Sequence, residues 1–514
     1  PFDDCGSLAI SGDPDHPANY GHLCAKGMAL SDTIGPDTRL KAPMRRRLKG
    51  GFEETSWEGV LAEIASGLQR IKNEYGPNSI AFYLSGQLLT EDYYVANKLM
   101  KGFIGSANVD TNSRLCMASA VAGHRRAFGA DTVPGCYEDI DLADLIVIVG
   151  SNTAWCHPIL FQRILNRRKQ GAKIFVIDTR RTITAESADL FLQILPGSDQ
   201  ALFSGLLVYL AESRALDQQF ISNNTADFEL ALTAAKNISP SLASVTEACE
   251  EDESNIRNFY QSFASTERVV TLFSQGVNQS SQGVDKVNAI INCHLATGRI
   301  GKPGAAPFSL TGQPNAMGGR EVGGLANMLA AHMDFDPVNV DRVKRFWNAP
   351  NIVDREGLKA IQLFDAISDG KIKALWVCGT NPAVSLPDAD KYRKSLSKLE
   401  LFIISDNYIS NDTINSGAHI LLPALAWGEK NGTVTNSERC ISRQRAFLRP
   451  LKNARPDWAI FAETARRMGF AGFDYNHVAD VFREHAALSG FENLSDRDFD
   501  ISAMAYLTDN EYDK

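Results

Sequence analysis

Length, composition and charge limit what this chain can be. It has 514 residues, of which 44% are apolar and 22% are charged, as in ordinary globular proteins. At about 150 residues per domain we expect roughly three domains. No apolar run is long enough to cross a bilayer. The net charge of −9 argues against a general nucleic-acid binder, because such proteins present a basic surface.

The cysteines limit the class of protein further. Nine of them are spread along the chain without the dense spacing of a secreted disulfide scaffold, so a reducing compartment such as the cytoplasm fits better. The chain begins with Pro1 rather than Met, and we expect the natural protein to have a preceding segment, which could include a targeting signal.

The first elements are a loop-rich lobe and a helix. Residues 1–44 are rich in Gly, Pro and Asp and lack periodic apolar positions, so something other than a large core must organise them, and a metal cluster is one candidate. The arginine run 45–47 fits a solvated loop or interdomain salt bridges better than a phosphate or partner patch. Residues 57–71 show helical periodicity after Ser56, a suitable N-cap.

Continuous apolar runs then predict the strands of buried parallel sheets. Helical periodicity at residues 91–103 and 159–168 separates some of them, which is the βαβ pattern. The sequence therefore predicts a multi-domain α/β protein with two parallel-sheet αβα domains and a small N-terminal lobe. The predicted strands cover residues 80–84, 144–149, 173–177, 269–273, 374–378 and 401–404.

Residues that can contact a ligand follow these strands. In parallel sheets, ligands bind outside the carboxyl ends of the strands. Gly150, Ser151 and Asn152 follow one strand and Gly379 to Asn381 follow another; their backbone N–H groups can hold a phosphate or a polar heterocycle. A purely structural glycine turn remains the alternative. The chain lacks the complete dinucleotide-binding fingerprint and the P-loop motif.

Two further segments have the chemistry of a nucleotide site. Asp178 ends a predicted strand and precedes Arg180 and Arg181, a combination that suits a purine base or ribose, although a capping carboxylate with surface arginines is an equal alternative. The run from Pro196 to Gln200 opens a long apolar helix, and Asp199 within it is an N-cap, a guanine contact, or both.

Several longer segments resemble the molybdopterin oxidoreductase superfamily, and the assimilatory nitrate reductases in particular. The resemblance runs nearly end to end, and its centre is Cys116 followed by Met117, Ala118 and Ser119. The segments that carry it are residues 18–27, 83–92, 111–119, 135–139, 150–158, 311–320 and 436–439.

The resemblance implies a molybdenum site. Cys116 would be the thiolate ligand of molybdenum, together with the dithiolene sulfurs of two molybdopterin guanine dinucleotides; a buried inert thiol is the alternative for a cysteine without this context. Formate dehydrogenases of the superfamily have His after this cysteine, whereas Met117 has no acid–base group. Met117 and Met317 would line the substrate pocket, and Gln313 and Arg320 would attract nitrate, although Arg320 could instead form a structural salt bridge.

It also implies the contacts of the other cofactors. A 4Fe-4S cluster needs four thiolates. Cys24 and Cys5 would supply two of them, and the other two are not found in this chain. Lys26 would conduct electrons between the cluster and a pterin. The remaining cofactor contacts would be Gln87, Asn112, Gly150, Ser151, Asn152, His157, Asp178, Arg180, Pro196, Gly197, Asp199, Gln200, Gln275, Gly276, Gly312, Met317, Gly379, Asn381, Ser405 and Asp406.

The implied protein is a nitrate reductase catalytic subunit cut at both ends. Its domains would be a partial iron–sulfur lobe at residues 1–44, a discontinuous pterin-binding domain at 45–125 with 300–514, and a Rossmann-like domain at 126–299, without the C-terminal β-rich domain of the family. It would reduce nitrate to nitrite in the cytoplasm with electrons from ferredoxin or a flavoprotein, and would bind neither nucleic acid nor membrane. The alternatives are a formate dehydrogenase of the same superfamily and a cofactor-free structural homologue.

Overall fold

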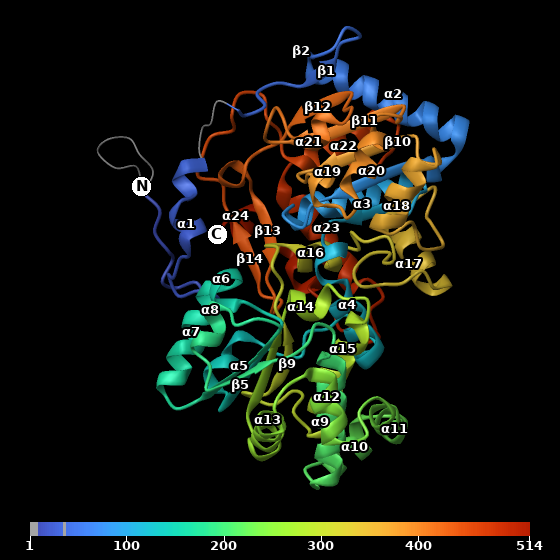
Figure 1. Ribbon diagram of the computed structural model, residues 1–514. Coiled ribbons are helices and arrows are strands. Elements are labelled where there is room, and N and C mark those ends of the chain that lie inside the picture. The colour runs from blue at the N-terminus through green and yellow to red at the C-terminus, as the bar shows by residue number, and fades with distance from the viewer. Residues whose placement is uncertain (1–8, 34–37) are drawn as a thin grey trace. The chain divides into compact units, whose positions relative to one another are not determined.

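The computed structural model describes residues 9–33 and 38–514, so the predicted ligand Cys5 lies outside the described residues. The chain folds into two compact units, and many of their elements are labelled in Figure 1. Within the described parts of the chain, no helix is both long and apolar enough to span a membrane. Unit 1 contains residues 9–33, 116–312 and 437–440. Unit 2 contains residues 38–115, 313–436 and 441–514.

Unit 1 is built on a five-stranded parallel sheet with the strand order β7-β6-β5-β8-β9. Alternate residues of β5 pack against helices on opposite faces. Val147 belongs to one hydrophobic cluster with α9 (Asp199–Glu212), α13 (Glu253–Ser265) and α15 (Gly283–Ala296). Ile148 belongs to another with α5 (Tyr137–Leu142) and α7 (Pro158–Lys169). This two-sided burial explains why the strand is apolar throughout. The strands are β5 (Leu145–Val149), β6 (Lys173–Asp178), β7 (Leu190–Gln193), β8 (Val269–Phe273) and β9 (Ala306–Ser309).

The helices of unit 1 connect these strands and cover both faces of the sheet. They are α1 (Ala25–Met28), η1 (Leu30–Thr33), α4 (Arg114–Phe128, which begins in unit 2), α5 (Tyr137–Leu142), α6 (Thr153–Cys156), α7 (Pro158–Lys169), α8 (Ile183–Glu186), α9 (Asp199–Glu212), α10 (Gln218–Asn224), α11 (Phe228–Ile238), α12 (Leu242–Cys249), α13 (Glu253–Ser265), α14 (Gln275–Asn278) and α15 (Gly283–Ala296).

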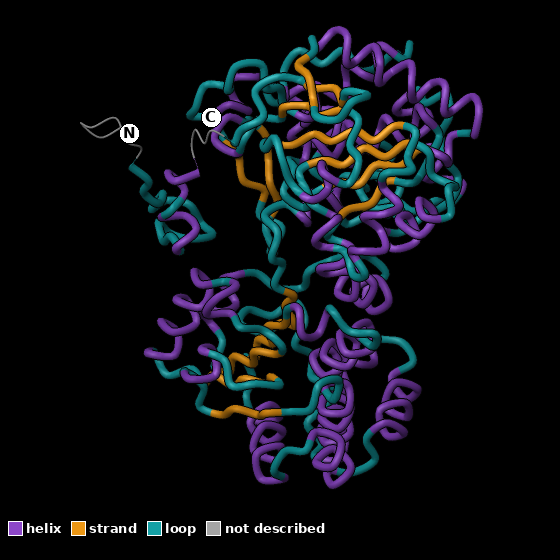
Figure 2. Tube along the Cα trace, turned by 45° about the horizontal axis from the view of Figure 1, so that its top comes forward, coloured by secondary structure: helices purple, strands orange, loops and turns teal. Residues whose placement is uncertain are grey.

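Unit 2 is built on a seven-stranded mixed sheet with the order β2-β1-β12-β11-β10-β3-β4. The strands from β12 to β4 are parallel, and the β1–β2 hairpin adds two antiparallel strands at one edge; Figure 2 shows the strands in orange and the helices in purple. The strands are β1 (Met44–Arg46), β2 (Phe52–Glu54), β3 (Ile80–Leu84), β4 (Val109–Thr111), β10 (Ala374–Cys378), β11 (Leu401–Asp406), β12 (Ile420–Pro423) and the separate pair β13 (Gly432–Thr435) and β14 (Ile441–Gln444).

Helices also cover both faces of the larger sheet. Ser56 caps α2 as predicted, because its side chain accepts a hydrogen bond from Gly59 N. The helices are α2 (Trp57–Tyr75), η2 (Pro77–Ser79), α3 (Thr90–Lys98), η3 (Leu99–Ile104), α16 (Ala316–Glu321), α17 (Pro337–Trp347), α18 (Ala360–Ser368), α19 (Pro382–Ser385), α20 (Ala389–Leu396), α21 (Asp412–Asn415), η4 (Trp427–Glu429), α22 (Asp457–Arg467), α23 (Val478–Gly490), η5 (Ser502–Tyr506) and α24 (Asp509–Asp513).

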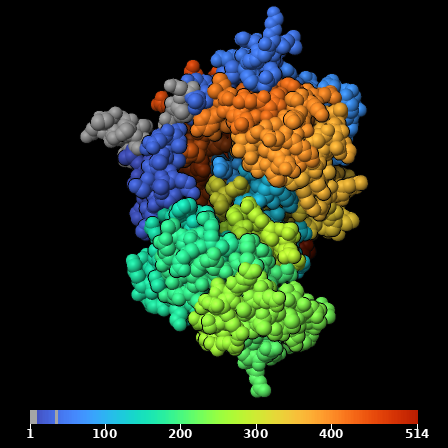
Figure 3. All heavy atoms as spheres, in the orientation of Figure 1, coloured from blue at the N-terminus to red at the C-terminus, as the bar shows by residue number. Residues whose placement is uncertain are grey.

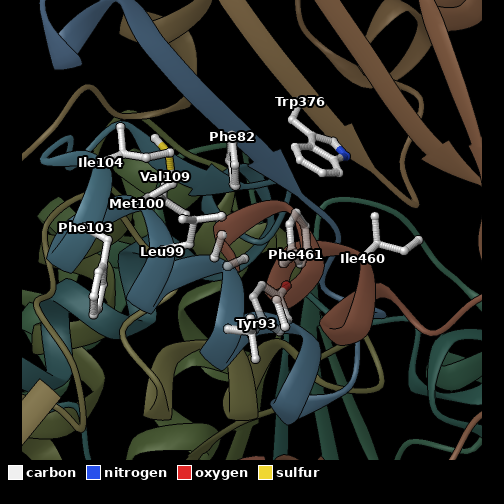
Figure 4. Close-up of a cluster of buried hydrophobic side chains, with 14 of the residues drawn as sticks. Phe82, Tyr93, Leu99, Met100, Phe103, Ile104, Val109, Trp376, Ile460 and Phe461 are labelled. Atoms are coloured by element: carbon white, nitrogen blue, oxygen red, sulfur yellow. The ribbon is translucent and has the colours of Figure 1, made fainter. Parts of the chain in front are cut away.

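An aromatic cluster fixes α22 on this sheet (Figure 4). The Phe82 and Trp376 rings from the neighbouring strands β3 and β10 lie 5.3 Å apart, and the Phe461 ring from α22 lies 5.5 Å from Phe82 and 4.8 Å from Trp376. Such ring pairs add to the stabilisation that comes from burying their area. These rings therefore pack α22 against the middle of β3 and β10.

The α/β fold with parallel sheets is confirmed, and so are the six predicted strands, with ends that differ by no more than two residues. One predicted helix differs in kind. Residues 91–103 begin as the α-helix α3, but from Leu99 to Ile104 the chain forms a π-helix, a form that is often found at functional sites. The three-domain division of the sequence, with its separate lobe at 1–44, stays a prediction.

The β1–β2 hairpin projects at the top of Figure 3 as a blue extension. It carries the arginine run. Arg45 and Arg47 pair with Glu53 across the hairpin, and Arg46 donates to the carbonyls of Ile414 and Ala418. Arg45 and Arg47 thus form exposed salt bridges, but these lie within the hairpin and not between domains.

Candidate functional site

The strand order of unit 1 creates a crevice between β5 and β8. From β5 the chain moves outward through β6 and β7 on one side, and then returns to β8 and β9 on the other. Gly150 follows β5 and Gly276 follows β8, and Gly276 N donates to Gly150 O at 2.9 Å. A Cβ atom on Gly150 would lie 2.8 Å from Gly276 Cα. Glycine is therefore required at this turn, which lies where open α/β sheets bind their ligands.

A cavity of about 600 Å³ opens at this edge. Residues from the ends of β5, β6 and β8 line it together with the segment that enters α9. The lining residues include eight that the resemblance implied as cofactor contacts, namely Gly150, Asn152, Asp178, Arg180, Pro196, Gly197, Asp199 and Gly276. The structure thus brings together residues that are as far as 126 positions apart in the sequence.

Charged groups of both signs face this cavity. Asp199 Oδ2 forms an ion pair with Lys286 Nζ at 2.6 Å, and their side chains are only 10% and 3% exposed. Asp178 Oδ1 accepts a hydrogen bond from Thr179 N at 2.7 Å. Carboxylates accept the N–H groups of a heteroaromatic base, and Lys and Arg bind phosphate. The cavity therefore combines the groups that recognise both parts of a nucleotide.

Six predicted cofactor contacts of unit 1 do not line this cavity, and Ser151, His157 and Gln200 are three of them. Ser151 Oγ pairs with Thr153 Oγ1 at 2.9 Å. His157 Nε2 lies 3.0 Å from Thr311 O, and burial, together with the charge of Lys26, lowers the pKa of His157, so the imidazole is neutral near pH 7. Gln200 lines a different cavity of about 360 Å³ between α9, α11 and α15.

Cys116 lies on α4 beside Gln275. Gln275 Nε2 lies 2.9 Å from Cys116 Sγ, while the other polar atom of this amide, Oε1, is buried without a hydrogen-bond partner in the described part of the protein. Met117 is 3% exposed, and its φ of −127° is not helical, so the chain changes direction directly after the thiol. A Cβ on Gly312 would lie 3.8 Å from Gln275 Nε2, so Gly312 lies next to the Gln275 amide.

The carboxyl edge of the unit 2 sheet gathers a second set of predicted contacts. Asn112 joins the turns after β3 and β10, because its Oδ1 accepts from Gly86 N at 2.9 Å and its Nδ2 donates to Thr380 Oγ1 at 3.2 Å. Gly379 N donates to Ser405 O, and Gly379 has a φ of +60°. These two turns follow β3 and β10, the point at which the strand order of this sheet reverses.

The other predicted contacts at this edge form local hydrogen bonds. Gln87 N donates to Ser85 Oγ. Asn381 Oδ1 accepts from Thr413 N at 3.1 Å. Asp406 Oδ2 accepts from Asn411 Nδ2 at 3.0 Å. These bonds shape the strand-end loops, which is a structural role.

The residues implied for the substrate lie on and before α16. Gln313 Oε1 accepts from Ser113 Oγ at 2.7 Å. Met317 and Arg320 are 1% and 5% exposed, and Arg320 Nη2 contacts Met317 Sδ. A guanidinium that is removed from water next to thioether sulfur is a suitable binding group for a small anion.

Only part of the N-terminal lobe is described. Cys24 precedes α1, and Lys26 lies within it. Desolvation raises the pKa of the Cys24 thiol, but the N–H groups of Gly27 and Lys26 and the charge of Lys26 lower it more, so the pKa is lowered overall. Among residues 9–33 and 38–514, no three His, Cys, Asp or Glu side chains are grouped as metal ligands.

The molybdopterin oxidoreductase profile matches residues 39–467, and the profile of the Fe4S4 domain of the same family matches residues 4–35. The chain belongs to the molybdopterin oxidoreductase family. It is 51% identical over 511 residues to a nitrate reductase of Klebsiella oxytoca, covering 99% of this chain and 58% of the relative. It is 48% identical over 513 residues to a nitrate reductase of Shewanella frigidimarina, covering 99% and 54%.

A third relative and a solved structure are also similar to this chain. A nitrate reductase of Synechocystis is 42% identical over 494 residues, covering 95% of this chain and 69% of the relative. Acetylene hydratase from Pelobacter acetylenicus superposes with a TM-score of 0.78, covering 100% of this chain and 71% of the other, at 20% identity, which shows the fold alone. The chain spans little more than half the length of the first two relatives.

The residues of this chain fit the molybdopterin cofactor of the family. Unit 1 offers a nucleotide-sized cavity, a glycine pair that allows close backbone approach, and the thiol of Cys116 beside a buried amide oxygen that has no hydrogen-bond partner among the described residues. The cofactors of the two matched families are molybdopterin and a 4Fe-4S cluster. For the cluster, the described residues of the lobe offer one thiolate, that of Cys24.

Sequence reasoning missed Lys286, which lines the cavity and pairs with Asp199. One signal could have identified it. Lys286 lies next to Val287 and one turn before Ile290, on the side of α15 that is otherwise apolar and buried. A lysine in such a position needs an acidic partner or a ligand.

Proposed function

We propose that this chain contains the α/β cofactor-binding units of a nitrate reductase catalytic subunit, which reduces nitrate to nitrite. The observation that carries the proposal is the near end-to-end likeness to proteins named nitrate reductase, with Cys116 and Met117 in the matching segment. The molybdenum–pterin group would supply two-electron oxygen-atom transfer.

The residues around Cys116 have distinct roles in this proposal. The Cys116 thiolate would bind the metal, since a soft thiolate suits this class of centre. Gln275 lies beside the sulfur and would orient it through its amide group. Met117 is buried and offers no proton donor or acceptor for acid–base chemistry, so it would exclude water rather than transfer protons.

Arg320 and Gln313 would bind the substrate. The Arg320 guanidinium is nearly removed from water, so its attraction for a nitrate anion is screened little. The Gln313 side chain is held by Ser113 and would direct its amide N–H groups at nitrate oxygen. Met317 beside Arg320 would keep this surrounding apolar.

Two guanine dinucleotides would occupy the two strand-end edges. In unit 1 the cavity beside Gly150 and Gly276 would take one nucleotide, with Asp178 and Asp199 as acceptors for the guanine N–H groups. In unit 2 the turns joined by Asn112 would take the other. Acid release of the nucleotide, followed by chromatography, identifies its base. We expect guanine, at about two nucleotides per chain.

Electrons would enter through the 4Fe-4S cluster, with Lys26 between cluster and pterin. We propose ferredoxin or a flavoprotein as the donor, and nitrate assimilation in the cytoplasm as the setting. A relative from Desulfovibrio desulfuricans, 38% identical over 503 residues, is named a periplasmic nitrate reductase, so cell fractionation with compartment markers is the direct test of location.

The activity test compares two substrates on one preparation of the full-length protein. We expect nitrite from nitrate with reduced viologen, and no dye reduction with formate. Formate must be included because a formate dehydrogenase subunit of Methanocaldococcus jannaschii is 34% identical over 478 residues. Cys116→Ser should abolish nitrite formation, whereas Cys156→Ser, at an exposed cysteine of the same unit, should not. Formate oxidation without nitrate reduction would refute the proposal.

A further inference from the structure

The segment from Val322 to Leu329 has no regular secondary structure, yet it is buried except at Asn327. It directly follows α16, the helix that carries Met317 and Arg320. Buried carbonyl groups outside helices and sheets need other hydrogen-bond donors, because an unpaired one is costly. The carbonyls of this segment therefore need donors from elsewhere in the fold.

Two side chains from a neighbouring helix supply them. Lys101 Nζ lies 2.6 Å from Gly323 O, 2.9 Å from Leu325 O and 2.5 Å from Met328 O. One turn earlier, Asn97 Nδ2 donates to the carbonyls of the two end residues, Val322 and Leu329, at 2.9 Å each. Asn97 and Lys101 thus bind five carbonyls of one eight-residue segment, and we call this pair the carbonyl clamp.

Lys101 is held by these carbonyls and not by an acidic partner. Its side chain is fully buried, and no carboxylate of the described residues forms an ion pair with it within 4.0 Å. Burial lowers the pKa of Lys101 to about 7, although the charge of Asp110 acts to raise it. The three carbonyl oxygens favour the ammonium form, which alone has a proton for each of them.

Lys101 lies within the π-helix η3. It is four positions after Asn97, and both side chains reach the same segment although the α-helix ends at Lys98. Lys98, on the same helix, reaches in another direction. Its Nζ binds Glu484 Oε1 and Gly472 O, both at 2.6 Å, so it is a natural control for a buried ammonium on this helix.

The opposite side of the segment is tied to the residues that precede Cys116. Arg114 Nη2 donates to Asn327 Oδ1 at 2.6 Å, and Arg114 also binds Asp110 through two hydrogen bonds of 3.0 and 3.1 Å. Arg114 is only two positions before Cys116 in the sequence. The segment therefore connects the helix of the implied substrate residues with the turn that leads to the implied metal ligand.

We propose that Lys101 and Asn97 are positioning residues for the substrate helix α16, and that their hold on the carbonyls of residues 322–329 fixes Arg320 for nitrate. This rests on the proposed function for its catalytic readout. Neither residue touches substrate or cofactor. Misplacing a binding group by about 1 Å can reduce turnover roughly a hundredfold. Loss of the carbonyl clamp is therefore expected to slow nitrate reduction although neither residue contacts the substrate.

The test uses the full-length protein with its cofactors and three variants: Lys101→Ala, Asn97→Ala and, as control, Lys98→Ala. Hydrogen exchange of the peptide 316–329 is measured without turnover, and nitrate kinetics are measured beside it. In Lys101→Ala we expect exchange of this peptide to rise about tenfold or more, and kcat/KM for nitrate to fall by at least about tenfold.

Methylammonium provides a specific rescue. A small ammonium ion can occupy the space of the lost Nζ, so it should restore slow exchange and most of kcat/KM in Lys101→Ala. In Lys98→Ala it should change neither the exchange of residues 316–329 nor kcat/KM. If Lys101→Ala does not fold, Asn97→Ala is expected to show the same local rise in exchange at residues 316–329. Unchanged exchange there in the folded clamp variant, or no rescue by methylammonium, would overturn the positioning role. If exchange at residues 316–329 responds to the variants as expected but the wild-type protein does not reduce nitrate, the proposed function is refuted and the hold on this segment stands.

Discussion

The close approach of Gly150 and Gly276 can be tested by placing methyl groups in it. Gly150→Ala adds two penalties. Its φ of +54° lies in the left-handed region, where a side chain costs about 1 kcal/mol. The new Cβ would also lie 2.8 Å from Gly276 Cα, and such overpacking costs about 1–3 kcal/mol. The sum is roughly 2–4 kcal/mol.

Two other glycines separate these penalties. Gly379 has a similar φ of +60°, but its nearest neighbour would be Ser85 Cβ at an ordinary 3.5 Å, so Gly379→Ala reports the backbone penalty of about 1 kcal/mol alone. Gly276 is not in the left-handed region, yet its Cβ would lie 2.7 Å from Gly150 Cα. Gly276→Ala therefore reports the contact penalty alone.

The assay is hydrogen exchange of the peptides that contain β5, β8 and β10, with the bound nucleotide quantified in parallel. For Gly150→Ala we expect the opening constant of β5 and β8 to rise roughly thirtyfold to a thousandfold, since about 1.4 kcal/mol is a factor of ten, with loss of nucleotide. For Gly379→Ala we expect roughly a fivefold rise at β10. If Gly150→Ala raises the opening constant no more than Gly379→Ala does, the inference that the close approach requires glycine is wrong.

Three further predictions follow from buried charges. Lys286→Met should leave the Asp199 carboxylate without its partner and reduce guanine nucleotide content at least about threefold by acid release and chromatography; unchanged content would exclude a role for the ion pair. Burial raises the pKa of Glu91 to about 7 from 4.5, so the folded protein binds this proton more tightly than the unfolded chain does. The free energy of unfolding therefore falls as the pH rises from about 4.5 to 7. Glu91→Gln should remove this loss of about 3 kcal/mol, seen as a higher melting temperature than wild type at pH 8 and no higher at pH 4.5. Arg320→Lys should raise KM for nitrate about tenfold through loss of the planar fork, and steady-state kinetics would contradict this if KM stayed the same while kcat fell.

The strands were predictable because two-sided burial leaves a plain trace in the sequence. Every residue of β3, β5, β8 and β10 is buried, so these strands appear as continuous apolar runs. The short strand β4 (Val109–Thr111) and the edge strand β7, which is only partly buried, carry no such signal. The π-helix at Leu99 was not predictable, because helical periodicity does not distinguish it from a continuing α-helix.

The candidate site was predictable in part for a similar reason. The rule for parallel sheets identified the strand-end residues Gly150, Asp178 and Gly379 without any structure. It could not show that Gly150 meets Gly276, because that contact depends on strand order. Lys101 and Lys286 were missed because a lysine on a helix is usually solvated, and only tertiary contacts reveal that both are buried.

The discontinuity of unit 2 has a consequence for how this protein is made. Its strands β3 and β10 are neighbours in the sheet, but about 290 residues separate Leu84 from Ala374 in the chain. At roughly 5–20 residues per second, a ribosome needs about 15–60 s to bridge that interval. During this time nearly all of unit 1 is already synthesised and free to fold, while β3 has only β4 to pair with until β10 is made. A nascent chain of this design needs a chaperone most at its first apolar strands.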